Sequence, residues 1–287
     1  MINFEPKRIL CPVDFSEQSA AALRVAGGMA KAVGAELIIL HVQHVEAPVY
    51  FTAAQAQTLK AQFRRNVRAA KHHANEFCNE YLSEPVKHSV MVLEGDPVSA
   101  ILKAQKDLSA DLVAMGTHGR GGLAHVRLGS ISESVLRQAE VPILTVGPRT
   151  KYTPALGSIR RVLCPVNYSP LAQTTLEHAA ALAARTGAEL IVAHIEENPG
   201  GKDEQGALEQ LCNWVPANIR ARCAVKEVVK QGRAAEQIVA EAKKSRADLL
   251  VMGAQPRSLL GASFFGSTTE LVIRSSPCPV LSIIGKR

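Results

Sequence analysis

The chain has 287 residues, of which 47% are hydrophobic and only 4% aromatic, and its formal net charge is +7. This length fits two domains of ordinary size, and the composition is typical of globular proteins with aliphatic cores and excludes a disordered chain. The first residues contain no apolar signal segment and no apolar run is long enough to span a membrane, which predicts a cytoplasmic protein without membrane contact.

The positive charge alone does not predict a nucleic-acid partner. Lys and Arg are scattered, and the densest basic cluster, residues 64–73, would form one face of a helix. No helix-turn-helix, zinc-ligand spacing or aromatic-laced RNA motif accompanies it. We therefore interpret the cluster as a solvated helix face and expect no nucleic-acid binding.

Apolar runs alternate with helical patterns along the first part of the chain. A strand over 8–13 precedes a helix that begins near Ser16 and ends near Gly34, and a strand over 37–42 follows. The pattern further predicts helices at about 53–82, 97–108 and 130–139, and strands at 86–93, 112–115 and 143–146.

The second part of the chain repeats the first. Residues 9–13 (ILCPV) recur as 162–166 (VLCPV), and the sequence GAELI at 34–38 recurs at 187–191. Further strands are expected at 221–229, 249–252 and 280–284. A repeat this long can hold its own core, so the sequence predicts two homologous domains, residues 1–148 and 158–287, joined by an exposed linker.

Continuous apolar strands that alternate with helices are typical of parallel sheets buried on both faces. We therefore expect an α/β protein with two tandem doubly wound parallel five-stranded sheets and helices on both faces. Such sheets bind ligands at the carboxyl ends of their strands, where the strand order reverses. In the first domain, Asp14 and Gly116 follow the two strands that would flank this point.

A glycine motif follows the buried strand at 112–115. Gly116 and Gly119 are separated from Gly129 and Ser130 by a spacer of nine residues. The glycines would permit positive φ and close approach of a ligand, Ser130 would donate at a helix start, and Arg120 would supply charge-assisted donors. Neither a Walker P-loop nor a G-x-G-x-x-G fingerprint occurs, so the motif predicts a phosphate site of another kind.

The glycine motif resembles the nucleotide-binding motif of the universal stress protein family. Residues 9–16, 40–42 and 111–120 carry the resemblance, which extends over nearly the whole chain, twice. It implies an ATP-binding protein that acts as a nucleotide-dependent sensor or regulator in a stress response. An interaction scaffold with a vestigial nucleotide site and a slow ATPase remain as alternatives.

The resemblance also implies which residues contact ATP. Asp14 and the backbone around Pro12 and Val42 would meet the adenine and ribose, while Met115 and Gly116 would line the path to the phosphates. The phosphates, with Mg²⁺ as an accompanying ion, would be held by Gly119, Arg120, Gly129, Ser130 and Ile131. No catalytic residue and no metal-ligand set is expected, because the chain shows no paired carboxylates and no positioned nucleophile.

Four histidines are expected to have no catalytic role. His118 and His125 lie within the motif region without a carboxylate to complete an acid–base pair. His41 and His194 occupy equivalent strand ends in the two copies and are predicted to be partly buried and hydrogen-bonded to the backbone.

The second copy departs from the motif. Asn167 replaces Asp14, and Pro256 replaces Gly119, which removes one backbone donor from a phosphate site. Arg257 and the pair Gly266-Ser267 are retained. The sequence therefore predicts that the C-terminal domain binds ATP poorly or not at all.

The last strand of each copy, 142–146 and 279–284, is an apolar edge strand that would recruit another strand. The family resemblance implies dimerisation through such strands. A tandem chain would satisfy this contact internally, as a pseudo-dimer of its two domains. Homodimerisation of whole chains through the same edges stays open.

Overall fold

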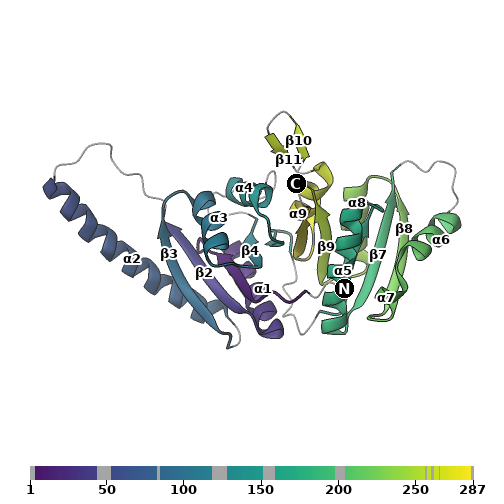
Figure 1. Cartoon of the computed structure of the whole chain (residues 1–287), viewed down its shortest axis with the longest axis horizontal. Coiled ribbons are helices and arrows are strands. Elements are labelled where there is room, and N and C mark those ends of the chain that lie inside the picture. Colours follow the sequence, from purple (N-terminus) through teal and green to yellow (C-terminus); the bar gives the residue numbers. More distant parts are fainter. Residues whose placement is uncertain are drawn as a thin grey trace.

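The computed structural model describes residues 4–43, 53–82, 85–117, 128–150, 159–197, 204–255, 257–259, 262–264 and 266–285. The two halves of the chain lie side by side and have the same architecture (Figure 1). The expected linker, residues 151–158, lies outside the described residues.

The first half alternates strands and helices as the sequence predicts. Its elements are β1 (Arg8–Pro12), α1 (Glu17–Val33), β2 (Glu36–Gln43), α2 (Ala53–Tyr81), β3 (His88–Glu94), α3 (Pro97–Asp107), β4 (Leu112–Gly116), α4 (Ser130–Gln138) and β5 (Ile143–Val146). The N-terminal part of α2 extends past β3 at the edge of the sheet (Figure 1).

The second half repeats this order with additions. Its elements are β6 (Arg161–Val166), α5 (Pro170–Thr186), β7 (Glu189–Glu196), α6 (Glu204–Trp214), α7 (Ala217–Arg220), β8 (Val225–Gln231), α8 (Ala234–Lys244), β9 (Leu249–Ala254), β10 (Arg257–Leu259), β11 (Ala262–Phe264), α9 (Ser267–Ser275) and β12 (Val280–Ile284). Strands β10 and β11 form a separate antiparallel hairpin.

The strand order is β3-β2-β1-β4-β5-β12-β9-β6-β7-β8. Within each half all paired strands are parallel, and the order reverses between β1 and β4 and between β6 and β9. This confirms two doubly wound five-stranded sheets. They join at their last strands, because β5 and β12 pair antiparallel with Leu144 opposite Leu281. The chain therefore forms the expected internal pseudo-dimer, with one ten-stranded sheet.

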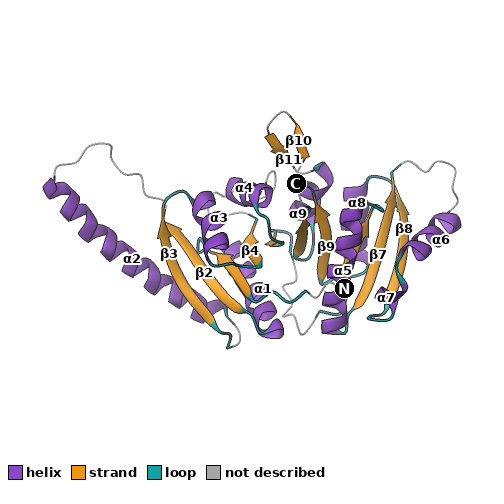
Figure 2. Ribbon diagram, viewed as in Figure 1, coloured by secondary structure: helices purple, strands orange, loops and turns teal. Residues whose placement is uncertain are grey.

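Helices cover both faces of the sheet, and successive strand residues face opposite sides (Figure 2). On β1, Ile9 and Cys11 pack on the face covered by α1, whereas Leu10 belongs to the core beneath α3 and α4. Each of these two cores continues across the β5–β12 pair into the second half. The two domains consequently share their hydrophobic layers.

The helix that follows the first strand begins and ends at the predicted residues, and its equivalent in the second copy has the same kind of caps. The Ser16 side chain accepts a hydrogen bond from the Ser19 backbone at the N-terminus of α1, and Gly34 ends the helix with a φ of 72°. Ser169 and Gly187 do the same for α5. The capping residues and the left-handed glycine therefore act as sequence signals.

The predicted strand over 221–229 begins too early. Ala221 is the C-cap of α7, and the strand starts only at Val225. Pro216, at the N-cap, starts a helical turn of four residues, which is too short to show a helical period in the sequence.

The interpretation of the basic cluster as a solvated helix face agrees with the structure, in which Arg65, Arg68 and Lys71 are exposed.

No helix among the described residues combines the length and apolar character that crossing a membrane requires.

Candidate functional site

A crevice opens at the carboxyl ends of β1 and β4, where the strand order reverses. Its cavity has a volume of about 120 Å³ and is bounded by these strands together with β2, α3 and the first turn of α4. Six of the predicted site residues line it: Pro12, Asp14, Val42, Met115, Gly116 and Ile131. The fold thus brings together residues that lie far apart in the sequence.

The other four predicted residues belong to the glycine motif. Gly129 is the N-cap of α4 and Ser130 is the first residue of that helix, so both precede the cavity-lining Ile131 directly. Gly119 and Arg120 lie outside the described residues, as do His118 and His125.

Asp14 is held in a tight turn after β1. Its Oδ1 atom accepts hydrogen bonds from the Ser16 backbone at 3.1 Å and from the Ser16 hydroxyl at 2.6 Å. Between them, Phe15 adopts the left-handed conformation, with a φ of 65°. The Phe15 ring packs on His41, whose Nδ1 lies 2.9 Å from the Val13 carbonyl oxygen. A carbonyl can only accept, so His41 donates and fixes the carboxyl end of β1, as predicted for a structural histidine.

Gly116 acts differently from the prediction. Neither Gly116 nor Gly129 has a positive φ: Gly116 ends a regular strand, and Gly129 has a φ of −60°. Gly116 does allow a close approach, but the element that approaches it is α1 and not a ligand. A Cβ at Gly116 would lie 2.9 Å from the carbonyl carbon of Gln18. The glycine therefore lets the strand end pack against the first turn of the helix.

Ser132 is a site residue that the sequence reasoning missed. Its hydroxyl donates to the Gly116 carbonyl oxygen at 2.8 Å and so ties α4 to the end of β4. It is buried and lines the cavity. A signal was present, since Thr269 supplies a hydroxyl at the equivalent position of the second copy.

The first turn of α4 presents backbone donors at the crevice. The first hydrogen bond into this helix runs from the Glu133 N–H to the Gly129 carbonyl at 2.9 Å. The N–H groups of Ser130, Ile131 and Ser132 precede that bond, and the positive end of the helix dipole lies at the same place. This arrangement favours an anion.

The second half contains an equivalent and larger crevice of about 330 Å³. Asn167 stands where Asp14 does, and its Oδ1 accepts from the Ser169 backbone at 3.3 Å and from the Ser169 hydroxyl at 2.7 Å. The supporting turn is repeated as well, because Tyr168 has a φ of 61° and His194 Nδ1 lies 3.0 Å from the Val166 carbonyl oxygen. Pro256 lies outside the described residues, and the side chain of Arg257 is likewise not described.

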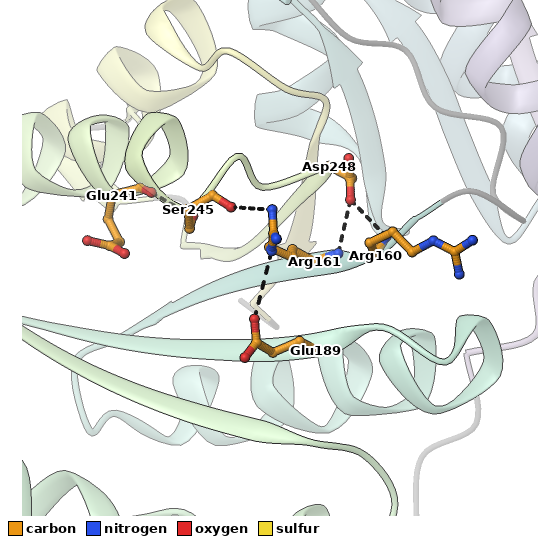
Figure 3. Close-up of polar contacts among 6 residues, drawn as sticks. All are labelled: Arg160, Arg161, Glu189, Glu241, Ser245 and Asp248. Atoms are coloured by element: carbon orange, nitrogen blue, oxygen red, sulfur yellow. Dashed lines mark hydrogen bonds and ion pairs between the residues drawn. The ribbon is translucent and has the colours of Figure 1, made fainter.

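One aspartate in each half, Asp111 just before β4 and Asp248 just before β9, lies at the opposite end of the sheet from the crevice. Asp248 Oδ2 accepts from the backbone of Arg160 at 2.8 Å and of Arg161 at 3.0 Å, as Figure 3 shows. The Arg161 side chain in turn donates to the Ser245 carbonyl at 3.0 Å. Asp111 makes the equivalent bonds in the first half. These aspartates join the first and fourth strands of each sheet at their amino ends.

Within the described ranges, no three His, Cys, Asp or Glu side chains gather closely enough to hold a metal ion.

These observations define a class of protein: a tandem α/β chain whose two halves are joined at their last strands and each carry a crevice at the topological switch point. The sequence model of the universal stress protein family matches residues 5–147 and 158–283. The chain belongs to this family, with two domains in tandem.

Known proteins of the family are similar over one domain or over both. A universal stress protein of Mycolicibacterium smegmatis is 28% identical over 294 residues, which cover 96% of each chain. One from Thermus aquaticus is 34% identical over 140 residues, covering 49% of this chain and 98% of the relative. The crystal structure of a universal stress protein from Archaeoglobus fulgidus superposes with a TM-score of 0.70 at 24% identity, covering 98% of this chain and 99% of that one. The last likeness shows the shared fold.

Proposed function

We propose that the N-terminal crevice binds ATP and that the chain acts as a nucleotide-dependent sensor or regulator in a stress response. The observation that carries the proposal is the convergence of six of the ten predicted residues on one cavity at the switch point. Membership of the universal stress protein family supports a role in stress.

The lining of the cavity suits the base and the ribose. Its walls are mostly apolar, with Leu40, Val42, Ile101 and Met115 offering contacts to a flat ring. Asp14 supplies the one ionisable side chain among the described lining residues. Its Oδ1 is engaged by Ser16, which leaves Oδ2 to accept a hydrogen bond from a ligand.

The start of α4 suits the phosphates. Three backbone N–H groups and the helix dipole favour negative charge there. Mg²⁺ would accompany the triphosphate. We propose binding without a dedicated catalytic step, because the described lining offers no nucleophile paired with a base.

Calorimetric titration of the nucleotide-stripped chain with ATP and Mg²⁺ tests the proposal. We expect one site per chain. In the variant Val42→Phe, the added ring fills the cavity and should weaken ATP binding at least about tenfold, equivalent to about 1.4 kcal/mol. The matched variant Ile195→Phe places the same ring in the C-terminal crevice and should leave ATP binding unchanged.

Thermal unfolding of both variants shows whether each retains the fold. Two ATP sites per chain would contradict the assignment to the N-terminal half alone. Absence of ATP binding by the intact chain would favour the interaction scaffold over the sensor. Release of inorganic phosphate from bound ATP, measured in the same samples, decides whether slow hydrolysis accompanies binding.

A further inference from the structure

The two crevices present opposite hydrogen-bonding groups at equivalent positions. Asp14 and Asn167 each use Oδ1 to accept from the serine two residues later. Because a backbone N–H can only donate, the bond from Ser169 N–H fixes the orientation of the Asn167 amide. The remaining atom is therefore a carboxylate oxygen in the first crevice and the Nδ2 donor in the second. The first crevice therefore suits a ligand group that donates a hydrogen bond, and the second suits a ligand group that accepts one.

A second difference places a carboxylate elsewhere in the C-terminal crevice. Glu197, just after β7, lines this cavity and is its one charged side chain among the described residues. Its Oε1 accepts from the Ala234 backbone N–H at 2.9 Å, which caps α8 and holds the carboxylate in place. In the first half, α3 is capped by its own Asp96, which does not line the cavity.

Asn167 and Glu197 line the same cavity. Val166 pairs with His194, so Glu197 lies two positions beyond the β7 residue that faces Asn167. Strand geometry separates their backbones by roughly 8 Å, a span over which the two side chains can reach adjacent atoms on one edge of a ring. A ligand that satisfies both offers an acceptor to Asn167 and, beside it, a donor to Glu197.

We propose that the C-terminal crevice binds a 6-oxopurine nucleoside, such as inosine or guanosine, and not an adenine nucleotide. The O6 atom of such a base is an acceptor and the adjacent N1–H is a donor, whereas adenine presents the reverse pattern of N6 donor and N1 acceptor. The inference rests on the proposed function only in treating the two crevices as duplicated nucleoside sites.

The shape and charge of the second crevice agree with this ligand. Its apolar walls repeat those of the first crevice, with Ile195, Ile238 and Met252 in place of Val42, Ile101 and Met115. Its volume of about 330 Å³ falls within the range of small-molecule sites. An uncharged nucleoside avoids the repulsion that a phosphate placed near the Glu197 carboxylate would meet.

The test is calorimetric titration of the full chain with inosine and with adenosine, in the presence of saturating ATP to occupy the N-terminal crevice. Inosine should bind at one site per chain, roughly ten- to a hundredfold more tightly than adenosine. Asn167→Asp should abolish this preference, because each base then makes one favourable contact and one unfavourable contact. Glu197→Gln, in which the side-chain oxygen can still cap α8, should weaken inosine binding about tenfold. Each variant is first shown to unfold at the wild-type temperature.

Asp14→Asn is the matched control, because it changes the equivalent residue of the other crevice. It should weaken ATP binding and leave inosine binding unchanged. ATP binding without inosine binding, or equal affinity for inosine and adenosine, would overturn the inference while the proposed function stands. Inosine binding that depends on Asn167, in a chain that does not bind ATP, would overturn the proposed function alone.

Discussion

His178 is one of the residues that link the N-terminal segment to the second domain. The His178 ring, on α5, meets the buried Phe4 ring edge-on, with the centroids 5.8 Å apart. Its Nδ1 atom is buried without a hydrogen-bond partner. Burial lowers the pKa of His178 from its ordinary value of about 6.5, and the neighbouring Glu177 only partly opposes this shift. The neutral imidazole is therefore the form that suits this interface.

The lowered pKa of His178 predicts a loss of stability in acid. As the pH is lowered below about 6.5, the unfolded chain gains a proton at this residue before the folded chain does. The free energy of unfolding therefore decreases as the pH decreases, until the lowered pKa of the folded state is reached. Urea unfolding between pH 7 and pH 5 should show a smaller decline in His178→Leu than in the wild type. His88→Gln, at an exposed histidine, should retain the full decline. Identical declines in wild type and His178→Leu would contradict the assignment.

At the scale of elements, the contact between the end of β4 and the first turn of α1 limits residue 116 to glycine. A Cβ there would lie 2.9 Å from the backbone and 2.9 Å from the Cβ of Gln18. Gly116→Ala should therefore lower the free energy of unfolding by about 1–3 kcal/mol, measured by urea denaturation. The control Gly266→Ser adds its side chain where no atom lies within 4 Å and supplies a good N-cap for α9, so it should be neutral or slightly stabilising. Equal costs in the two variants would exclude crowding as the cause.

Elements were predictable wherever their signals are local. Ser16 and Gly34 mark the ends of α1, and apolar runs mark the strands, so the order of elements follows from neighbouring residues. Asp14 and Gly116 were predictable as crevice residues because the carboxyl ends of parallel strands meet at one edge of a sheet, whereas the other four cavity-lining residues followed from the family resemblance.

Contacts between distant segments were not predictable in the same way. That Gly116 packs against Gln18, and that Ser132 bonds to the Gly116 carbonyl, depends on how helices dock on the finished sheet. The positive φ expected at Gly116 was wrong for this reason: the glycine is needed for space and not for its backbone freedom. The replacement of Asp14 by Asn167 was visible in the sequence. That the second crevice presents a donor where the first presents an acceptor follows only from the orientation of the Asn167 amide.

At the scale of the whole molecule, the two domains are held together by more than the linker. The β5–β12 pair places the fully buried Leu144 opposite Leu281, and the Thr145 hydroxyl donates to the Val280 carbonyl at 3.2 Å. Away from this seam, the Arg185 side chain donates to the Ala32 carbonyl at 3.0 Å. The domain contact is thus mainly a continuous sheet with a shared core on each face.

This seam predicts that the chain will stay assembled after its linker is cut. A protease site introduced within residues 151–158 should yield two fragments that still elute together at the mass of the intact chain, because separation would expose two apolar strand edges. Size-exclusion chromatography with light scattering measures this directly. Arg185→Ala in the cleavable chain should not separate the fragments, since it removes only two peripheral contacts, with Ala32 and Glu5. Fragments that elute at half the mass would show that the linker, and not the β5–β12 pair, holds the two domains together.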